Sequence, residues 1–168
     1  MGNFFVEKAA ENSKKMKKLF ESVGQANIKV VGVGGAGNNM ASWLHDKGIK
    51  GAGIIAVNTD QQHLNITSAD VKFLIGKDVT KGLGCGGYPE KGEEAAKEQL
   101  SEIKNALDNP DMVFICAGMG GGTGTGAAPV IAKVAKDSGA IVIGVVTMPF
   151  KLERARIDKA ELGLSNLR

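Results

Sequence analysis

Three clusters of glycine are the part of this sequence best suited to chemistry. The chain has 24 glycines in 168 residues, roughly twice the ~7% of average usage, and they gather at Gly32–Gly37, Gly82–Gly87 and Gly118–Gly126. A residue without a Cβ accepts positive φ and lets a ligand approach the backbone, so that N–H groups reach phosphate oxygens. The clusters therefore predict loops that bind an anion.

The first cluster, Gly32–Gly37, matches the pattern G-x-G-x-x-G between an apolar strand and a helix. This pattern turns a strand directly into a helix whose N-terminus faces a pyrophosphate. Asp60 follows at about the spacing, ~20 residues, at which a dinucleotide site places a carboxylate on a ribose. Taken alone, this cluster favours an NAD-dependent oxidoreductase.

A second loop, Gly120–Gly126, has five glycines in seven residues. One tight turn does not need so many, and the loop precedes another predicted helix, with Thr123 and Thr125 as additional hydroxyl donors. Two phosphate loops favour a nucleoside triphosphate held by several strands. The sequence contains no G-x-x-x-x-G-K-[ST] segment, which excludes a P-loop protein.

Alternating apolar blocks and amphipathic segments must position these loops. We expect strands at 28–33, 54–57, 71–75, 112–117 and 140–147, and helices at 39–47, 90–107, 127–137 and 152–167. Such alternation implies right-handed crossovers and an α/β fold: a three-layer, doubly wound, mostly parallel sheet of Rossmann-like type. Its ligands bind at the carboxyl ends of the strands. We expect one domain, 28–168, preceded by an arm, 1–27, with an amphipathic helix at 4–23.

Composition excludes several other classes of protein. Hydrophobic residues make up 43% and charged residues 23%, as in ordinary soluble proteins, and no apolar run reaches the ~20 residues of a membrane span. The net charge of +3 leaves no basic face for nucleic acid. Cys85 and Cys116 have no zinc-ligand spacing, and two isolated cysteines indicate a reducing, cytosolic setting.

Taken together, these motifs resemble the tubulin/FtsZ family, in the form characteristic of FtsZ. The resemblance runs from Ile28 to the end of the chain, and the arm is more like that of archaeal members. It rests on five motifs in order: Gly32–Asn39, Ala56–Asp60, Lys81–Gly86 with Pro89, Asp111–Pro129, and Pro149-Phe150 with Glu153.

The resemblance implies a role for each loop. The α- and β-phosphates would contact backbone and amide groups of Gly35, Ala36, Gly37, Asn38 and Asn39. The β-phosphate would be held at a helix start by Gly122, Thr123 and Gly124. Gly34, Gly120 and Gly121 would be further nucleotide-binding residues of these two loops. The remaining glycine cluster, Gly82–Gly87, forms the third loop, in which Gly86 would sense the γ-phosphate. Tyr88, just after this loop, stands where family members usually have Asn. Asp60 would lie near the phosphates, either acting on a bound magnesium or only capping a helix.

The end of the chain would contribute to the ribose and nucleotide contacts. The resemblance assigns Glu153 to the ribose hydroxyls. The family pattern Glu-Gly-x-x-Arg is one residue shorter here, so that Arg156 is the nucleotide-contacting arginine, with Arg154 as the alternative.

The resemblance further implies a cytoplasmic GTP-binding protein, with GTP or GDP and Mg²⁺ as ligands. It would polymerise head to tail into the cell-division ring, act with other division proteins, and reach the membrane only through them. The chain would stop before the last strand, the central helix and the acidic loop that supplies catalytic carboxylates, so no catalytic residue is expected within it. Guanine selectivity follows from the resemblance alone.

Three readings of function remain open at this point: an assembly-dependent GTPase, an NAD oxidoreductase, and a nucleotide-binding module without catalysis. For the 168-residue chain itself we expect an open strand edge and an apolar face. These would cause dimers or larger species, with exchange of the terminal helix as one route.

Overall fold

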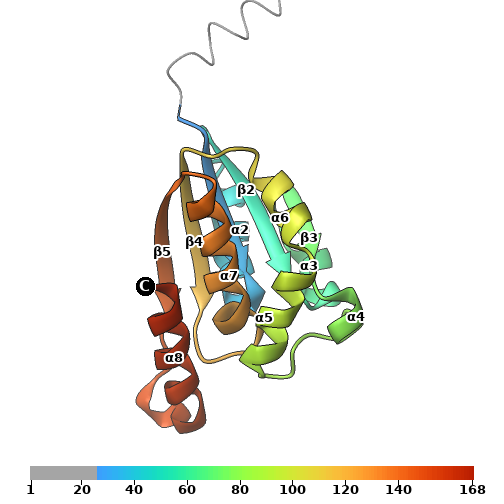
Figure 1. Cartoon of the computed structure of the whole chain (residues 1–168), viewed down its shortest axis with the longest axis vertical. Helices are drawn as coiled ribbons and strands as arrows, with labels where there is room; N and C mark the ends of the chain where they lie inside the picture. The colour runs from blue at the N-terminus through green and yellow to red at the C-terminus, as the bar shows by residue number, and fades with distance from the viewer. Residues whose placement is uncertain (1–25) are drawn as a thin grey trace, which may run out of the picture.

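A computed structural model describes residues 26–168 of the chain. The amphipathic helix predicted at 4–23 lies outside the described residues. The described part confirms the predicted fold class, an α/β domain around one parallel sheet (Figure 1).

Five parallel strands form the sheet in the order β3-β2-β1-β4-β5. Their bounds are β1 Ile28–Val33, β2 Ala52–Asn58, β3 Val71–Leu74, β4 Met112–Gly118 and β5 Ile141–Thr147. The central strands are apolar and β-branched without polar alternation, as expected when helices cover both faces of a sheet. The chain reverses its winding between β1 and β4, so the carboxyl ends of these two strands form the crevice where such folds bind ligands.

The helices divide between the two faces of the sheet. They are α2 Gly34–Asp46, α3 Gln61–Ile66, α4 Lys77–Thr80, α5 Pro89–Glu98, α6 Leu100–Leu107, α7 Thr123–Asp137, the 3₁₀ segment η1 Lys151–Arg156, and α8 Ile157–Leu167. In Figure 1, α7 and α5 lie in front of the sheet and α2 lies behind it. The larger apolar core lies on the α7 side, and a smaller one packs beneath α2.

Two helices begin earlier than the sequence predicts. We expected loops through Asn38 and Gly126, whereas α2 begins at Gly34 and α7 at Thr123. Glycine has a low helix propensity, so the glycine-rich first turns of both helices were predicted as loops. Contact with the neighbouring strands and loops overrides that preference, since a Cβ on Gly37 would collide with the carbonyl oxygen of Cys116.

The helix predicted at 90–107 is wrong in its continuity. Gln99 takes φ −122° and ψ 35° and separates α5 from α6. With this break Ile103 and Leu107 are buried, whereas Leu100, at the start of α6, is 41% exposed. The segment predicted as one helix from residue 152 is likewise divided, because Glu153 leaves helical φ and ψ within η1.

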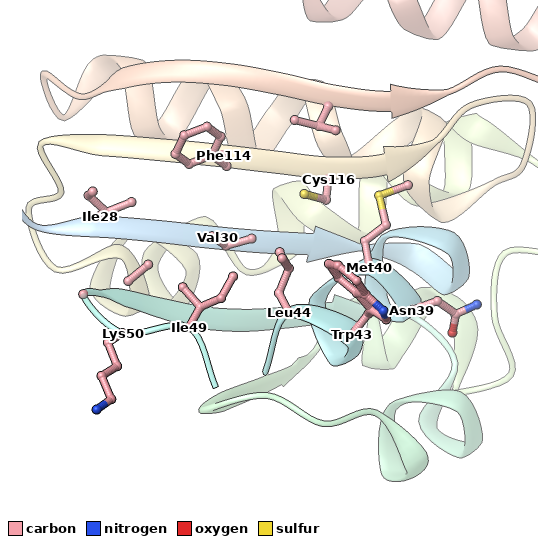
Figure 2. Close-up of a pocket in the computed structure, with 13 residues that line it drawn as sticks. Ile28, Val30, Asn39, Met40, Trp43, Leu44, Ile49, Lys50, Phe114 and Cys116 are labelled. Atoms are coloured by element: carbon pink, nitrogen blue, oxygen red, sulfur yellow. The ribbon is translucent and has the colours of Figure 1, made fainter. Parts of the chain in front are cut away.

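The α2 side of the sheet carries an open apolar groove of about 770 Å³. Figure 2 shows Phe114 and Cys116 of β4 facing it beside Val30 of β1, with Trp43 and Leu44 of α2 along its other wall. The groove continues onto β5, the last strand of the sheet among residues 26–168, where Ile141 is 62% and Val145 44% exposed.

Candidate functional site

A cleft of about 740 Å³ lies at the carboxyl ends of β1, β4 and β5. It collects eight of the site residues that the sequence predicts, from segments far apart in the chain: Gly35, Ala36, Gly121, Gly122, Thr123, Gly124, Glu153 and Arg156. The position agrees with the rule that open parallel sheets bind ligands beyond the carboxyl ends of their strands.

The two glycine loops touch each other at the floor of this cleft. Gly34 has φ +71°, a conformation that residues with a Cβ rarely adopt, and a Cβ there would lie 2.8 Å from the backbone nitrogen of Gly124. Across the loops, a Cβ on Gly118 would lie 2.7 Å from the Cβ of Ala36. Both positions require glycine for close approach, and this approach brings the N-termini of α2 and α7 together.

The N-termini of α2 and α7 are left for a ligand to satisfy. The first N–H groups of any helix have no partner within it, and neither α2 nor α7 has a side-chain cap or an acidic residue in its first turn. Each N-terminus carries roughly half a positive elementary charge. Two such ends facing one cleft make it suited to an anion with more than one charged group.

The second glycine loop is braced from within. Gly120 has φ +95°, and its N–H donates to the hydroxyl oxygen of Thr125 at 2.9 Å. Thr125 is buried, so its hydroxyl holds the loop instead of facing a ligand. The expectation that both threonines would donate to the anion is therefore wrong for Thr125, whereas Thr123 lines the cleft.

Asn38 has a structural position instead of a place in the cleft. It is fully buried. In the orientation that satisfies its whole amide, its nitrogen donates to the carbonyl oxygens of Gly32 (2.8 Å) and Val57 (3.2 Å), and its oxygen accepts from Asn58 Nδ2 at 3.0 Å. Both the nitrogen and the oxygen of the Asn38 side-chain amide thus have partners within the protein. The predicted contact of this amide with phosphate therefore has no support. Gly37 is also buried, behind the loop.

Three further predicted residues lie away from the cleft lining. Asn39 is exposed and borders the apolar groove under α2. Asp60 caps α3, its Oδ1 accepting from the backbone nitrogen of His63 at 3.1 Å. Gly86 is exposed in the third loop, with φ +60° and the ring of Tyr88 beside it. The helix-cap reading of Asp60 is thus the one that its observed contacts support.

The far wall of the cleft carries the ionic groups. Arg156 Nη1 lies 2.9 Å from Glu153 Oε2, and the other carboxylate oxygen of Glu153 accepts from the backbone nitrogen of Phe150 at 3.1 Å. Glu153 is half-exposed at the rim of the cleft. Arg156 lines the cleft and Arg154 does not.

Sequence reasoning missed several residues of the cleft and its support. Thr147, Met148, Pro149 and Phe150 complete its wall, and the carboxyl-end rule applied to β5 could have found them. Thr59 and Cys85 contact Thr123 from behind. Both lie within sequence motifs, Ala56–Asp60 and Lys81–Gly86, but the sequence does not show that their side chains meet Thr123. Cys116 lies in the core beneath α2, where burial raises the pKa of its thiol and so disfavours the reactive thiolate.

Residues 26–168 include no group of three or more acidic, histidine or cysteine side chains that could hold a metal. No helix formed by these residues combines the length and the apolar character needed to cross a bilayer.

Comparison with known proteins decides the family. Residues 27–168 match the GTPase domain of the Tubulin/FtsZ family. The chain belongs to the tubulin/FtsZ family. It is 53% identical over 162 residues to cell division protein FtsZ 2 of Methanocaldococcus jannaschii, covering 96% of this chain and 43% of the relative. It is 55% identical to FtsZ 2 of Haloferax volcanii, covering 88% of this chain and 37% of the relative.

Solved FtsZ structures agree with the fold. A mutant of M. jannaschii FtsZ superposes with a TM-score of 0.86 at 51% identity, covering 94% of this chain and 47% of the solved one. An empty FtsZ dimer from the same organism gives 0.84 at 53% identity, covering 91% and 46%. The chain therefore spans less than half the length of these tubulin/FtsZ relatives.

Proposed function

We propose that the cleft binds GTP or GDP, with the phosphates at the converging N-termini of α2 and α7. The observation that carries this proposal is that both helix ends lack a side-chain cap and an acidic first turn where they meet. Membership of a family of GTPases supplies the nucleotide. Guanine recognition has no residue assigned to it among those described.

Each wall of the cleft takes one part of the nucleotide in this proposal. Backbone N–H groups of Gly35 and Ala36 bind the α- and β-phosphates, and those of Gly121–Gly124, with the Thr123 hydroxyl, bind the β-phosphate. Glu153 accepts from the ribose hydroxyls, since a carboxylate oxygen is a strong acceptor for O–H groups. The ribose hydroxyls would compete with the Phe150 N–H, which donates to Glu153 in the structure. The Arg156 guanidinium has further N–H groups that can bind phosphate.

Magnesium enters this proposal with the nucleotide. Mg²⁺ in nucleotide sites is held by phosphates, waters and one or two carboxylates. The described residues offer one candidate, Asp60, which is half-buried near the third loop and keeps one oxygen on the α3 cap. With one candidate carboxylate among the described residues, the site fits a Mg²⁺ ion coordinated mainly by the phosphates and by water. The ion would neutralise part of the phosphate charge.

Hydrolysis belongs to the assembled protein in this proposal. Among the described lining residues of the cleft, Glu153 is the only acidic side chain, and it is paired with Arg156. Phosphoryl transfer depends on positioning and charge stabilisation, with a group that orients the attacking water. We propose that a neighbouring subunit in a head-to-tail filament supplies this group. The whole protein would then act in the cytoplasm, at the division site, with other division proteins.

Thermal unfolding with added nucleotide tests the binding proposal. A ligand that binds only the folded state stabilises it and so raises the melting temperature. At a ligand concentration one hundred times the dissociation constant, the free energy of unfolding rises by about 2.7 kcal/mol. We expect GTP and GDP with Mg²⁺ to raise it by several degrees and NAD to leave it unchanged. Equal stabilisation by NAD, or none by GTP and GDP, would contradict the proposal. Asp60 lies away from the cleft lining, so no observed contact favours the dinucleotide alternative.

Phosphate release from GTP tests the catalytic part. We expect the 168-residue chain to release none at any protein concentration, because Glu153, the acidic side chain among the described lining residues, is paired with Arg156. Release that rises steeply with protein concentration would place the catalytic groups within these residues.

A further inference from the structure

A cluster of three side chains lies at the inner wall of the cleft, with Thr59 and Cys85 buried and Thr123 half-buried. The hydroxyl oxygens of Thr59 and Thr123 are 2.7 Å apart, and the Cys85 sulfur lies 3.3 Å from the first and 3.5 Å from the second. Thr59 follows β2, Cys85 belongs to the third glycine loop, and Thr123 begins α7. Three segments thus meet at one hydrogen-bonded triangle.

Only one member of this triangle faces the cleft. Thr59 is fully buried and Cys85 is 4% exposed, and neither lines the cleft, whereas Thr123 does. Thr59 is also fixed at its backbone, because its carbonyl oxygen accepts from the Gly84 N–H at 3.0 Å. Thr59 can therefore influence a ligand in the cleft only through Thr123.

The count of hydrogens determines what this arrangement can do. Each hydroxyl has one hydrogen to donate and can also accept. If Thr123 donates to Thr59, its hydrogen is spent inside the protein. If Thr59 donates to Thr123, the hydrogen of Thr123 is left for another acceptor. Without a ligand that acceptor is the Cys85 sulfur, a weak one. An anion in the cleft is a far stronger acceptor.

We propose that Thr59 is a positioning residue for phosphate binding, donating its hydroxyl hydrogen to Thr123 so that the Thr123 hydroxyl donates to the anion in the cleft. Cys85 completes the chain by donating its thiol hydrogen to Thr59. Hydrogen bonds linked in one direction polarise one another and strengthen the terminal donor. This inference rests on the proposed function, and it assigns roles to two residues, Thr59 and Cys85, to which the sequence analysis gives none.

Calorimetric titration of the 168-residue chain with GDP and with GMP tests the proposal. Thr59→Val removes the donor and keeps the shape of the side chain, so we expect GDP to bind roughly five- to tenfold more weakly, the effect of about one hydrogen bond. GMP binding should change less than twofold, because GMP lacks the phosphate that Thr123 contacts. Thr59→Ser keeps the hydroxyl and should restore GDP affinity to within about twofold of the original chain.

A double substitution separates positioning from general destabilisation. The hydrogen-bond relay from Cys85 through Thr59 to Thr123 ends at the Thr123 hydroxyl, which donates to the anion. Thr123→Val removes this last donor, so adding Thr59→Val to it should weaken GDP binding by less than about twofold. Thr67→Val is the matched control: Thr67 is equally buried and donates its hydroxyl to the His63 carbonyl oxygen at 2.8 Å, away from the cleft. It should leave GDP affinity unchanged even where it lowers the melting temperature.

The outcomes distinguish this inference from the proposed function. If the unaltered chain binds GDP and Thr123→Val weakens it, while Thr59→Val has no effect or weakens GDP and GMP equally, the relay is wrong and the nucleotide site stands. If the unaltered chain does not bind GDP, both are wrong. Should Thr59→Val fail to fold, Thr59→Ala takes its place. It should likewise weaken GDP binding more than GMP binding.

Discussion

Two threonines of the glycine loop, separated by Gly124, have different tasks. Thr123 faces the cleft, whereas Thr125 is buried and accepts from the Gly120 N–H. We predict that Thr123→Val weakens GTP binding severalfold with a small change in melting temperature. Thr125→Val should instead cost roughly 1–3 kcal/mol of stability, because it leaves a buried N–H without a partner. Titration and thermal unfolding of both variants check this, and the reverse pattern would contradict the assignment.

Two arginines of η1 offer a second comparison between single residues. Arg156 lines the cleft beside Glu153, and Arg154 does not. We predict that Arg156→Ala weakens GTP binding by about fivefold, within the range for a charge-assisted hydrogen bond at a partly exposed site. Arg154→Ala should change it by less than twofold. Titration with GTP compares the two, and a larger loss for Arg154→Ala would move the nucleotide contact to that residue.

At the scale of the elements, the glycine loop before α7 is packed on one side and open on the other. A Cβ on Gly122 would lie 2.5 Å from the Cβ of Cys85 and 3.1 Å from the backbone of Tyr88, whereas a Cβ on Gly121 would meet nothing within 4 Å. We predict that Gly122→Ala lowers the melting temperature by several degrees, within the usual cost of overpacking, about 1–3 kcal/mol. Gly121→Ala should leave it nearly unchanged. Equal melting temperatures would mean that the third loop does not pack on α7 as described.

Strands and crossovers were predictable from sequence, and the details of the site were only partly so. Continuous β-branched runs such as Ile28–Val33 identify buried parallel strands, and the helices between them fix the topology. The helix starts at Gly34 and Thr123 were missed because tertiary contact overrides the low helix propensity of glycine. The burial of Asn38 could not be predicted, since its partners lie on two different strands.

The predicted ligand set divides along the same lines. Backbone donors in a loop follow from glycine content, so Gly35 and Gly122–Gly124 fall in the cleft as expected. Side chains depend on the direction in which they point, which sequence does not give, and Asn39 and Asp60 therefore lie outside its lining. The helix start at Gln61 was foreseeable only from its cap, Asp60.

For the whole molecule, the open face of the sheet predicts self-association. β5 pairs only with β4 among the described strands, and its Ile141, Ile143 and Val145 side chains are exposed beside the apolar groove. An unpaired strand edge next to an apolar surface favours contact between copies. We predict dimers or larger species of the 168-residue chain by light scattering.

A charge on this face is the matched test of that prediction. Val145→Lys should shift the chain toward monomer, since it places an ammonium group on the contact surface. Leu162→Lys, at an exposed position of α8 away from the groove, should not. Monomers in the unaltered chain at all concentrations, or equal effects of the two variants, would contradict self-association through this face.

The central claim, that phosphates bind where α2 and α7 converge, is tested most directly by backbone amide NMR. A GDP titration of the ¹⁵N-labelled Val145→Lys chain, followed by ¹H–¹⁵N spectra, reports each N–H group separately. We predict that the largest shifts occur at the amides of Gly35, Ala36 and Gly122–Gly124, with smaller ones near Glu153. Shifts concentrated instead around Trp43 and the apolar groove, or spread evenly over the sheet, would contradict it.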